Sequence, residues 1–378
     1  MIGILTFYWA DDYGALLQSY AIKTYLNRYQ ETILIPYFPE ELRHRYRFIQ
    51  FNKRDKGLGK CYRVVRQIIG QISRGVFYSN WKAKCKISRF RKRYLTDSSR
   101  RLRNSWEIYE FHKGIDTYVV GSDQVWNPRI TEGLQEGYFC TFKTWRKSHS
   151  RYVAYAASIG SERLEESFDQ LVSEYLDHFD AISLREHSAV PYIEKLCDKN
   201  LEVVLDPVFL IGREGWEALI RTNRKRRKGY IAVYYTEYNQ KMADYLKQLE
   251  QETGFYILLL APKNRGFHCT DNQVNAVGCG PLEFLEYLYH AEYVVTNSFH
   301  GLAMSIIFHK PFVVFPHSVR NARLSDILHT VHLEARIVEE GQTTELIREK
   351  IDWTKVDESL EKAVGYSKMF IEREILGY

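Results

Sequence analysis

The chain has 378 residues, more than the roughly 100–200 of one ordinary domain, and this length predicts two domains. Hydrophobic residues make up 45% and charged residues 26%, a globular composition that excludes wholesale disorder. The net charge is +6, but residues 42–103 hold 20 Lys and Arg against two acids. This segment predicts an anionic partner, because the other residues are acidic overall.

The start of the chain and its cysteines favour a soluble, intracellular protein. No basic segment and no small-residue cleavage site occur in the opening MIGILTFYWADD, so we expect no secretory signal. No apolar run approaches the roughly 20 residues that span a bilayer. The six cysteines are scattered without a CxxC pair, which is typical of reduced thiols and not of a disulfide framework or a zinc site.

Apolar runs alternate with helical stretches through the first half of the chain. Several runs are continuously apolar, as in a parallel sheet buried on both faces. The pattern predicts a Rossmann-like domain over residues 1–207, with the basic segment inserted at about 40–105. We expect strands at 2–8, 32–38, 117–122, 151–158, 181–186 and 202–207, and helices at 15–26, 161–179 and 187–197.

The second half repeats the alternation after a break. A helix and the basic run RTNRKRRKG occupy 208–228, which we interpret as a linker region. The sequence predicts an α/β protein of two Rossmann-like domains, 1–207 and 229–378, that face a cleft as in GT-B-type enzymes. The C-terminal helix could cross back to the first domain. We expect strands at 230–237, 256–262, 291–298 and 311–316, and a final helix at about 355–374.

Polar and small residues stand where predicted strands end, which is where open α/β sheets bind ligands. The segments are ADDYGALLQSYAI, VVGSDQVWN, YAASIGS, ISLREHSA and VVTNSFHGLAMSIIF. The last one opens an apolar helix, whose N-terminus is a potential anion site. The candidate substrate-binding residues in these segments are Tyr13, Gly14, Gln18, Ser122, Gln124, Ser158, Asn297, Ser298 and Gly301.

Taken together, these segments resemble one family, the polysaccharide pyruvyltransferases. The family motifs NYGAxLQxYA, GSDQVWN and SYAASFG correspond here to DYGALLQSYA, GSDQVWN and YAASIGS. Further along, SxRExSG, DPTxLL and TxSFHGxxFSIIFxKPF correspond to SLREHSA, DPVFLI and TNSFHGLAMSIIFHKPF, and an Arg-led stretch corresponds to NARLSDIL. The resemblance runs from about residue 10 to 336 and lapses in the basic block and the linker.

The resemblance implies transfer of pyruvate from phosphoenolpyruvate to a sugar as a cyclic ketal, with release of phosphate. This chemistry needs an acid for the enol carbon, a base for the sugar hydroxyl, and cations for the carboxylate and the phosphate. It needs neither a metal nor a redox cofactor, so phosphoenolpyruvate is expected as the co-substrate. The expected acceptor is a sugar on a polyprenyl diphosphate, a precursor of a capsule or exopolysaccharide.

Three residues are candidates for catalysis. His300 suits proton transfer, since its ordinary pKa is about 6.5, although a histidine at a helix start can also simply bond the backbone. Arg185 is a candidate anion clamp, or else a strand-end salt bridge to Glu186 or another acid. Asp123 is the candidate base for the sugar hydroxyl, with a turn or N-cap aspartate as the alternative.

One position departs from the family pattern. Many members carry an arginine two residues before the histidine, and this chain has Ser298 there. Asn297, Ser298 and the helix amides could bind the phosphate as neutral donors, assisted by Arg320 or Arg323. Both arginines could equally be solvated loop residues.

The basic block contains a basic amphipathic pattern with aromatic residues. We interpret it as a surface for an anionic membrane, on the inner face of the cytoplasmic membrane. The alternative is an insertion that packs its apolar stripe on the first domain. The residues concerned are the apolar Val65, Ile68, Ile69, Ile72 and Val76, the basic Arg63, Arg66 and Arg74, and the aromatic Phe77, Tyr78 and Trp81.

Two other functions stay open. A GT-B glycosyltransferase using a nucleotide sugar would share the architecture. A nucleic-acid-binding protein would use the basic block, although no recognised nucleic-acid motif supports it.

Overall fold

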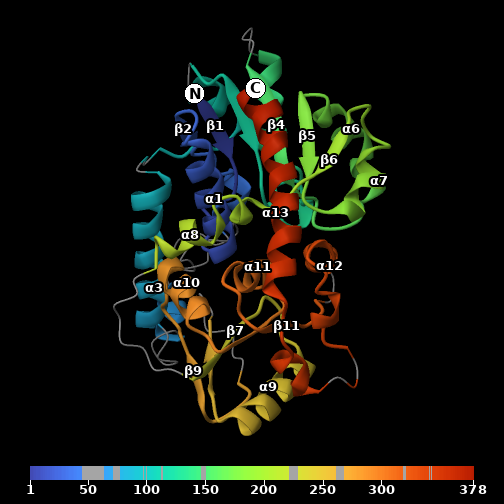
Figure 1. Ribbon diagram of the computed structural model, residues 1–378. Coiled ribbons are helices and arrows are strands. Elements are labelled where there is room, and N and C mark those ends of the chain that lie inside the picture. The colour runs from blue at the N-terminus through green and yellow to red at the C-terminus, as the bar shows by residue number, and fades with distance from the viewer. Residues whose placement is uncertain are drawn as a thin grey trace. The chain divides into compact units, whose positions relative to one another are not determined.

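The computed structural model describes residues 1–44, 64–70, 77–96, 98, 100–111, 114–145, 150–220, 229–260, 268–317, 321–339, 341 and 343–378. The chain forms two compact units. The first comprises Met1–Asn52, Arg91–Ile211 and Glu361–Tyr378, and the second comprises Lys53–Phe90 and Gly212–Leu360. Each contains one parallel sheet with helices (Figure 1). The predicted fold class, α/β with two Rossmann-like domains, is confirmed.

The first unit contains a six-stranded sheet of order β2-β1-β3-β4-β5-β6, parallel throughout. Every residue of its inner strands β1 and β3 is buried, as their continuous apolar sequence predicts. The strands are β1 (Ile2–Leu5), β2 (Thr32–Leu34), β3 (Thr117–Val120), β4 (Arg151–Ala157), β5 (Ala181–Leu184) and β6 (Leu201–Val203).

In each unit, all the strands that the sequence predicts are present, and each is shorter than predicted. The difference falls mainly at the carboxyl ends, where the prediction ran on into polar residues such as Ser122 and Arg185. These residues form side-chain hydrogen bonds beyond the last rung of the sheet.

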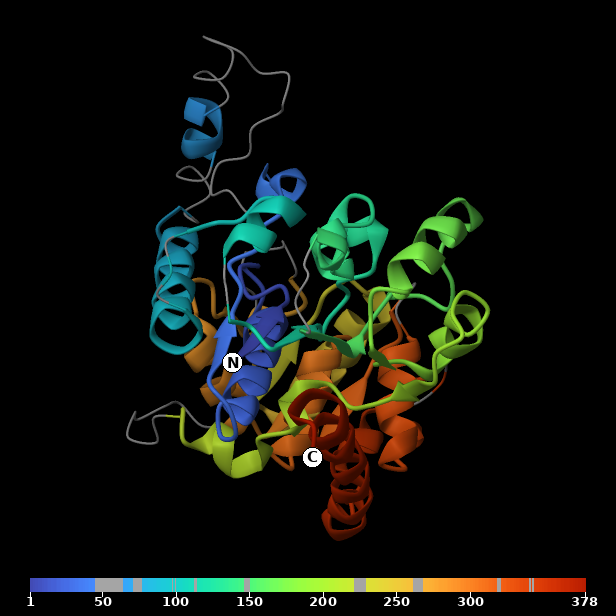
Figure 2. The same ribbon diagram turned by 90° about the horizontal axis from the view of Figure 1, so that it is seen from above.

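The helices of the first unit are α1 (Tyr13–Leu26), α4 (Ser105–Phe111), α5 (Pro128–Thr131), α6 (Asp169–Leu176) and α7 (Val190–Ile193). Asp12 caps α1 by accepting a hydrogen bond from the Ala15 amide at 3.2 Å. The helices predicted at 161–179 and 187–197 are much shorter. Irregular backbone over 161–165 and the 3₁₀ turn Glu166–Phe168 precede the first, and the 3₁₀ turn His187–Ala189 precedes the second. Both α6 and α7 lie beside β5 and β6 at one end of the sheet (Figures 1 and 2).

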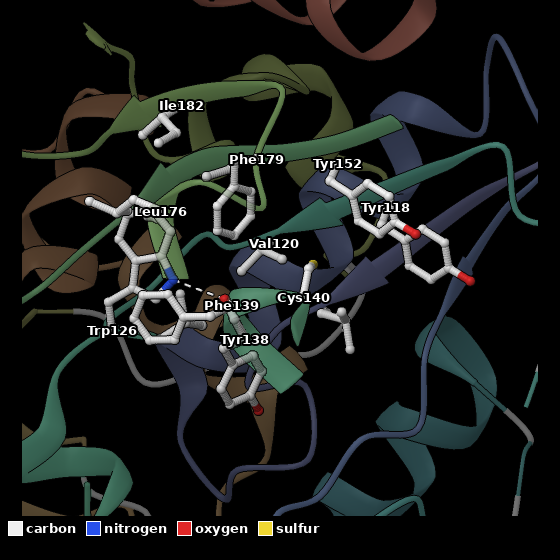
Figure 3. Packing of buried hydrophobic residues seen from close by; sticks show 14 of the residues in the cluster. Tyr118, Val120, Trp126, Tyr138, Phe139, Cys140, Tyr152, Leu176, Phe179 and Ile182 are labelled. Atoms are coloured by element: carbon white, nitrogen blue, oxygen red, sulfur yellow. Dashed lines mark hydrogen bonds between the residues drawn. The ribbon is translucent and has the colours of Figure 1, made fainter. Parts of the chain in front are cut away.

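Aromatic side chains fill the core of the first unit (Figure 3). Trp126 stacks on Phe139 with ring centroids 5.3 Å apart and donates its indole N–H to the Tyr138 carbonyl at 2.9 Å. Tyr118 and Tyr152, from adjacent strands, stack at 5.1 Å. The tryptophan of GSDQVWN is therefore a core residue that anchors the loop after β3.

The second unit contains a five-stranded parallel sheet of order β11-β10-β7-β8-β9. Its edge strand β9 was not predicted, because its sequence QVN is short and mostly exposed. The elements are β7 (Tyr230–Tyr234), β8 (Tyr256–Leu259), β9 (Gln273–Asn275), β10 (Tyr293–Thr296) and β11 (Phe312–Val314), with α8 (Gly212–Glu217), α9 (Gln240–Thr253), α10 (Pro281–Tyr289), α11 (Phe299–Ile307) and α12 (Ala322–Thr330).

Part of the basic block belongs to the second unit, whereas the predicted boundary 1–207 placed the whole block in the first. The helix α3 (Phe77–Phe90) packs on α10. Lys86 forms an ion pair with Glu283 at 2.6 Å. Gly278 and Gly280 lie so close to α3 that a Cβ atom on either would collide with it.

The structure describes only some of the residues that form the predicted amphipathic pattern of the basic block. Residues 64–70 are helical, and the side chains of Val65 and Ile69 are exposed. Membrane binding by this stripe and its packing on the first domain both stay predictions. Other residues of the pattern lie outside the described residues: Arg63, Ile72, Arg74 and Val76.

The end of the chain joins the first unit. The helix α13 (Trp353–Phe370) begins in the second unit, and its residues from Glu361 onward belong to the first. Ser367 accepts a hydrogen bond from the Leu205 amide at 2.9 Å, and Thr117 donates to the Ile375 carbonyl at 3.4 Å. The predicted crossing of this helix to the first domain is confirmed. The predicted second domain, 229–378, therefore includes 18 residues, Glu361–Tyr378, that belong to the first unit.

Within the described part of the chain, none of the helices combines the length and the apolar character needed to span a membrane.

Candidate functional site

In the first unit, polar side chains follow the carboxyl ends of neighbouring strands. The loop after β3 begins with Gly121, Ser122 and Asp123, and the peptide bond between the first two is cis. Asp123 has a φ of +78°, which aspartate tolerates better than most residues. Its carboxylate accepts a hydrogen bond from the Gln124 amide at 2.9 Å. Its backbone forms an isolated β-bridge with Ala157 at the end of β4. The candidate base thus lies in a tightly held turn.

Arg185 follows β5, with its side chain only 2% exposed. Its Nη1 donates to Asp206 Oδ2 at 2.8 Å and its Nη2 to Asp123 Oδ1 at 3.5 Å. Burial lowers the pKa of the guanidinium, but the neighbouring carboxylates, Asp206 first, outweigh this effect and raise the pKa above its ordinary value. Arg185 therefore forms the salt bridge that the sequence left open, with Asp206 and Asp123 as its partners. Its role as an anion clamp stays a prediction.

Asp206 also belongs to this cluster and is not among the candidates predicted from the sequence. It lies beyond the end of β6, its side chain is fully buried, and its Oδ2 accepts a second hydrogen bond from Ser122 Oγ at 3.2 Å. The available signal was an aspartate directly after an apolar run, at the start of DPVFLI.

Glu186 is engaged elsewhere. Its Oε1 accepts hydrogen bonds from Ser158 Oγ at 2.7 Å and from the Gly160 amide at 3.2 Å. Ser158, a predicted substrate-binding residue, is thus tied to a buried carboxylate. The arrangement holds the loop after β4 against the loop after β5.

The other predicted residues of the first unit are also buried. Gln18 donates from Nε2 to Thr6 Oγ1 at 2.8 Å, which ties α1 to the end of β1. Gln124 accepts from Asn127 Nδ2 at 2.6 Å. Tyr13 and Gly14 form the first turn of α1. These contacts show how the residues hold the loops in place, and their roles toward a substrate stay predictions.

In the second unit, the candidate histidine lies in the first turn of α11. Ser298 is the N-cap, its side chain makes no capping hydrogen bond, and its amide donates to Thr296 Oγ1 at 3.0 Å. His300 is buried, with its ring edge-to-face to Phe299 at 5.2 Å. A Cβ atom at Gly301 would overlap the Thr296 hydroxyl, so only glycine lets the helix start this close to β10. A helix start of this kind favours an anion, since first-turn amides lack acceptors within the helix.

Asn297 connects two loops of the second unit. Its Oδ1 accepts from the Thr236 amide at 2.8 Å, and its Nδ2 donates to the Glu237 carbonyl at 2.7 Å. The Glu237 carboxylate pairs with His317 at 3.3 Å. The Asn297 amide therefore holds the loop after β7 against the loop after β10, and its contact with phosphate stays a prediction.

The described candidate residues between Tyr13 and Gly301 fall into two clusters, one at the carboxyl edge of each sheet. Arg323 is half-buried on α12, and Arg320 lies outside the described residues. Among the described residues, no group of three His, Cys, Asp or Glu side chains is arranged to hold a metal ion.

Comparison with known proteins gives a family and a fold. The model of the family described as polysaccharide pyruvyl transferase matches residues 12–319, a range that includes both clusters. The sequence has no match among curated proteins.

Two solved structures cover the full chain. UDP-GlcNAc 2-epimerase from Neisseria meningitidis bound to UDP-GlcNAc has 9% sequence identity and a TM-score of 0.50, with 100% of this chain and 99% of that chain covered. The S. aureus MnaA-UDP co-structure has 12% identity and a TM-score of 0.50, with 100% and 97% covered. At such identities the likeness shows the fold alone, which is GT-B-like.

Proposed function

This chain belongs to the polysaccharide pyruvyl transferase family, and we propose that it transfers pyruvate from phosphoenolpyruvate to a sugar of a polysaccharide precursor. The observation that carries the proposal is the family match over residues 12–319, which spans both clusters. The proposed acceptor is a sugar linked to a polyprenyl diphosphate.

The reaction forms a cyclic ketal. A proton adds to the methylene carbon of phosphoenolpyruvate, which becomes a methyl group, and the central carbon becomes electrophilic. Two sugar hydroxyl oxygens bond to that carbon, and its bond to the phosphate oxygen breaks. One of the two hydroxyl protons balances the proton on the methyl group, and the other leaves with the phosphate. No metal or redox cofactor enters this scheme.

His300 is the proposed proton-transfer group, since imidazole gives and takes protons near neutral pH. The α11 N-terminus with Ser298 is the proposed phosphate site, because helix amides and the helix dipole favour an anion. Arg185 is the proposed clamp for the donor's carboxylate, and Asp123 the proposed acceptor for a sugar hydroxyl.

The direct test is incubation of the purified protein with phosphoenolpyruvate and candidate lipid-linked glycans. We expect phosphate release together with a glycan that has gained one pyruvyl ketal by mass spectrometry. A parallel incubation with nucleotide sugars is the control, because the fold neighbours contain uridine nucleotides. Sugar transfer without ketal formation would replace this proposal by a glycosyltransferase activity.

We also propose that α3 binds an anionic membrane surface. The helix carries four Lys or Arg and no acid. Tyr78 and Trp81, with 65% and 51% of their surface exposed, lie near one end, and Lys82 and Arg89 are exposed as well. Aromatic rings and cations suit the headgroup region of an anionic bilayer.

Replacing Trp81, Lys82 and Arg89 by alanine should weaken sedimentation with phosphatidylglycerol vesicles, and the effect should shrink with added salt. The control is Lys241→Ala with Lys247→Ala, which removes two exposed cations from α9. Equal losses of vesicle binding in both variants would mean that any exposed cations of the protein contribute equally, and that α3 is not a specific membrane surface. Salt-sensitive binding to nucleic acid without vesicle binding would favour the nucleic-acid alternative.

A further inference from the structure

A buried carboxylate without an assigned part in the proposed reaction lies next to Arg185. The side chain of Asp206 is fully buried. Its Oδ2 accepts from Arg185 Nη1 at 2.8 Å and from Ser122 Oγ at 3.2 Å, and its Oδ1 accepts from the Val208 amide at 3.1 Å. One carboxylate thus joins the ends of β3, β5 and β6.

The chain around Asp206 is held on both sides. The carbonyl of the preceding Leu205 accepts from the Tyr155 hydroxyl at 3.1 Å, and its amide donates to Ser367 Oγ at 2.9 Å. On the other side, Asp206 begins the short 3₁₀ turn Pro207–Phe209. The carboxylate therefore has a fixed position.

A fixed carboxylate determines how the guanidinium lies. The group is planar, so a short hydrogen bond at Nη1 constrains the direction of the other N–H groups. A guanidinium this deeply buried also needs an opposite charge to remain in the interior. Asp123 offers only a longer contact of 3.5 Å, so Asp206 is the main carboxylate that neutralises and orients the guanidinium.

We infer that Asp206 is a positioning residue for donor binding, which acts by fixing the guanidinium of Arg185 and the hydroxyl of Ser122. This inference rests on the proposed function, because Arg185 is the proposed clamp for phosphoenolpyruvate. Asp206 itself touches no substrate in this scheme.

The test compares Asp206→Asn and Asp206→Glu with the parent full-length protein. The asparagine keeps the shape and removes the charge, whereas the glutamate keeps the charge and moves it by one methylene. The control is Asp180→Asn, because Asp180 accepts from the Tyr152 amide at 2.7 Å and pairs with Lys143 at the opposite, amino edge of the same sheet. Calorimetry measures the affinity for phosphoenolpyruvate, and steady-state kinetics measure the KM for each substrate.

We expect Asp206→Asn to weaken phosphoenolpyruvate binding by about 10–100-fold, the range of one charge-assisted hydrogen bond. Asp206→Glu should show a smaller loss, and Asp180→Asn should bind as the parent does. The KM for the acceptor should change by less than about 3-fold in each variant, since the effect passes through the donor's clamp.

Two results would overturn the inference: donor affinity in folded Asp206→Asn equal to that of the parent, or equal losses for donor and acceptor. If Asp206→Asn does not fold, Asp206→Glu decides by the same criteria. Failure of both variants to fold would assign Asp206 a role in folding alone. Ketal formation by the parent separates these outcomes from failure of the proposed function, in which the parent itself would neither bind phosphoenolpyruvate nor turn it over.

Discussion

The two clusters differ in how they are held together. In the first unit, charged groups bond one another inside the protein, with Arg185 paired to Asp206 and Asp123. In the second unit, neutral groups such as Asn297 bond the backbone, beside a helix start with His300 in its first turn. A buried charge without its partner is very unfavourable, whereas a neutral group costs less. We therefore expect changes in the first cluster to alter stability as well as activity, and changes at His300 to alter activity alone.

The largest expected effect is on turnover. His300→Ala should lower kcat by about 10²–10⁴-fold, the usual contribution of a general acid–base group, while the melting temperature stays near that of the parent. His268→Ala, at an exposed histidine of the same unit, is the control and should turn over normally. A loss below about tenfold in a folded protein would remove His300 from the chemistry.

Arg185→Ala should affect both properties. Removal of the guanidinium leaves Asp206 buried without its partner, which costs about 3–5 kcal/mol in the free energy of unfolding. In the protein that remains folded, the substitution should weaken phosphoenolpyruvate binding more than it weakens acceptor binding. Urea unfolding and calorimetry measure the two effects. Unchanged stability would contradict the contrast between the clusters.

Ser298→Arg sharpens the comparison by placing a charge in the neutral cluster. The side chain would supply the cation that many family members carry there, and a charge-assisted hydrogen bond contributes about 1.5–3 kcal/mol. We expect tighter phosphoenolpyruvate binding by titration, whereas Ser298→Gln, of similar length without charge, should not tighten it. If Ser298 instead packs against the acceptor, the arginine will weaken acceptor binding alone. Loss of both affinities would show that Ser298 is misplaced in this scheme.

The smallest expected effect concerns the start of α11. Gly301→Ala would force a methyl group against Thr296, and overpacking of this kind costs about 1–3 kcal/mol of stability. Gly365→Ala is the matched control, since a Cβ atom at this helical glycine meets nothing within 4 Å and should be neutral or stabilising. Thermal unfolding compares the two variants, and equal melting temperatures would mean that α11 can move away from β10.

The sequence predicted what depends on local pattern. Continuous apolar runs located ten strands, and the resemblance singled out Arg185, Asp123 and His300 as candidates whose roles stay predictions. The local sequence pattern could not predict the pairing of Arg185 with Asp206. The two residues are 21 positions apart and meet only because β5 and β6 are neighbours in the sheet.

Asn297 shows the same limit in the second unit. Its partner Thr236 is 61 positions away, at the end of a strand that the sheet places beside β10. The assignment of α3 to the second unit depends likewise on Lys86 meeting Glu283, almost 200 residues later. Side-chain partners of this kind follow from strand order and helix packing, which a local pattern does not contain.

The C-terminal helix has a consequence for biosynthesis. Thr117 and Leu205 bond to residues 375 and 367, so the first unit has its full set of contacts only after the second has left the ribosome. Domains usually fold in the order in which they are translated. Here the unit that starts first should be completed last, and its nascent sheet should wait for these C-terminal residues with part of its surface uncovered.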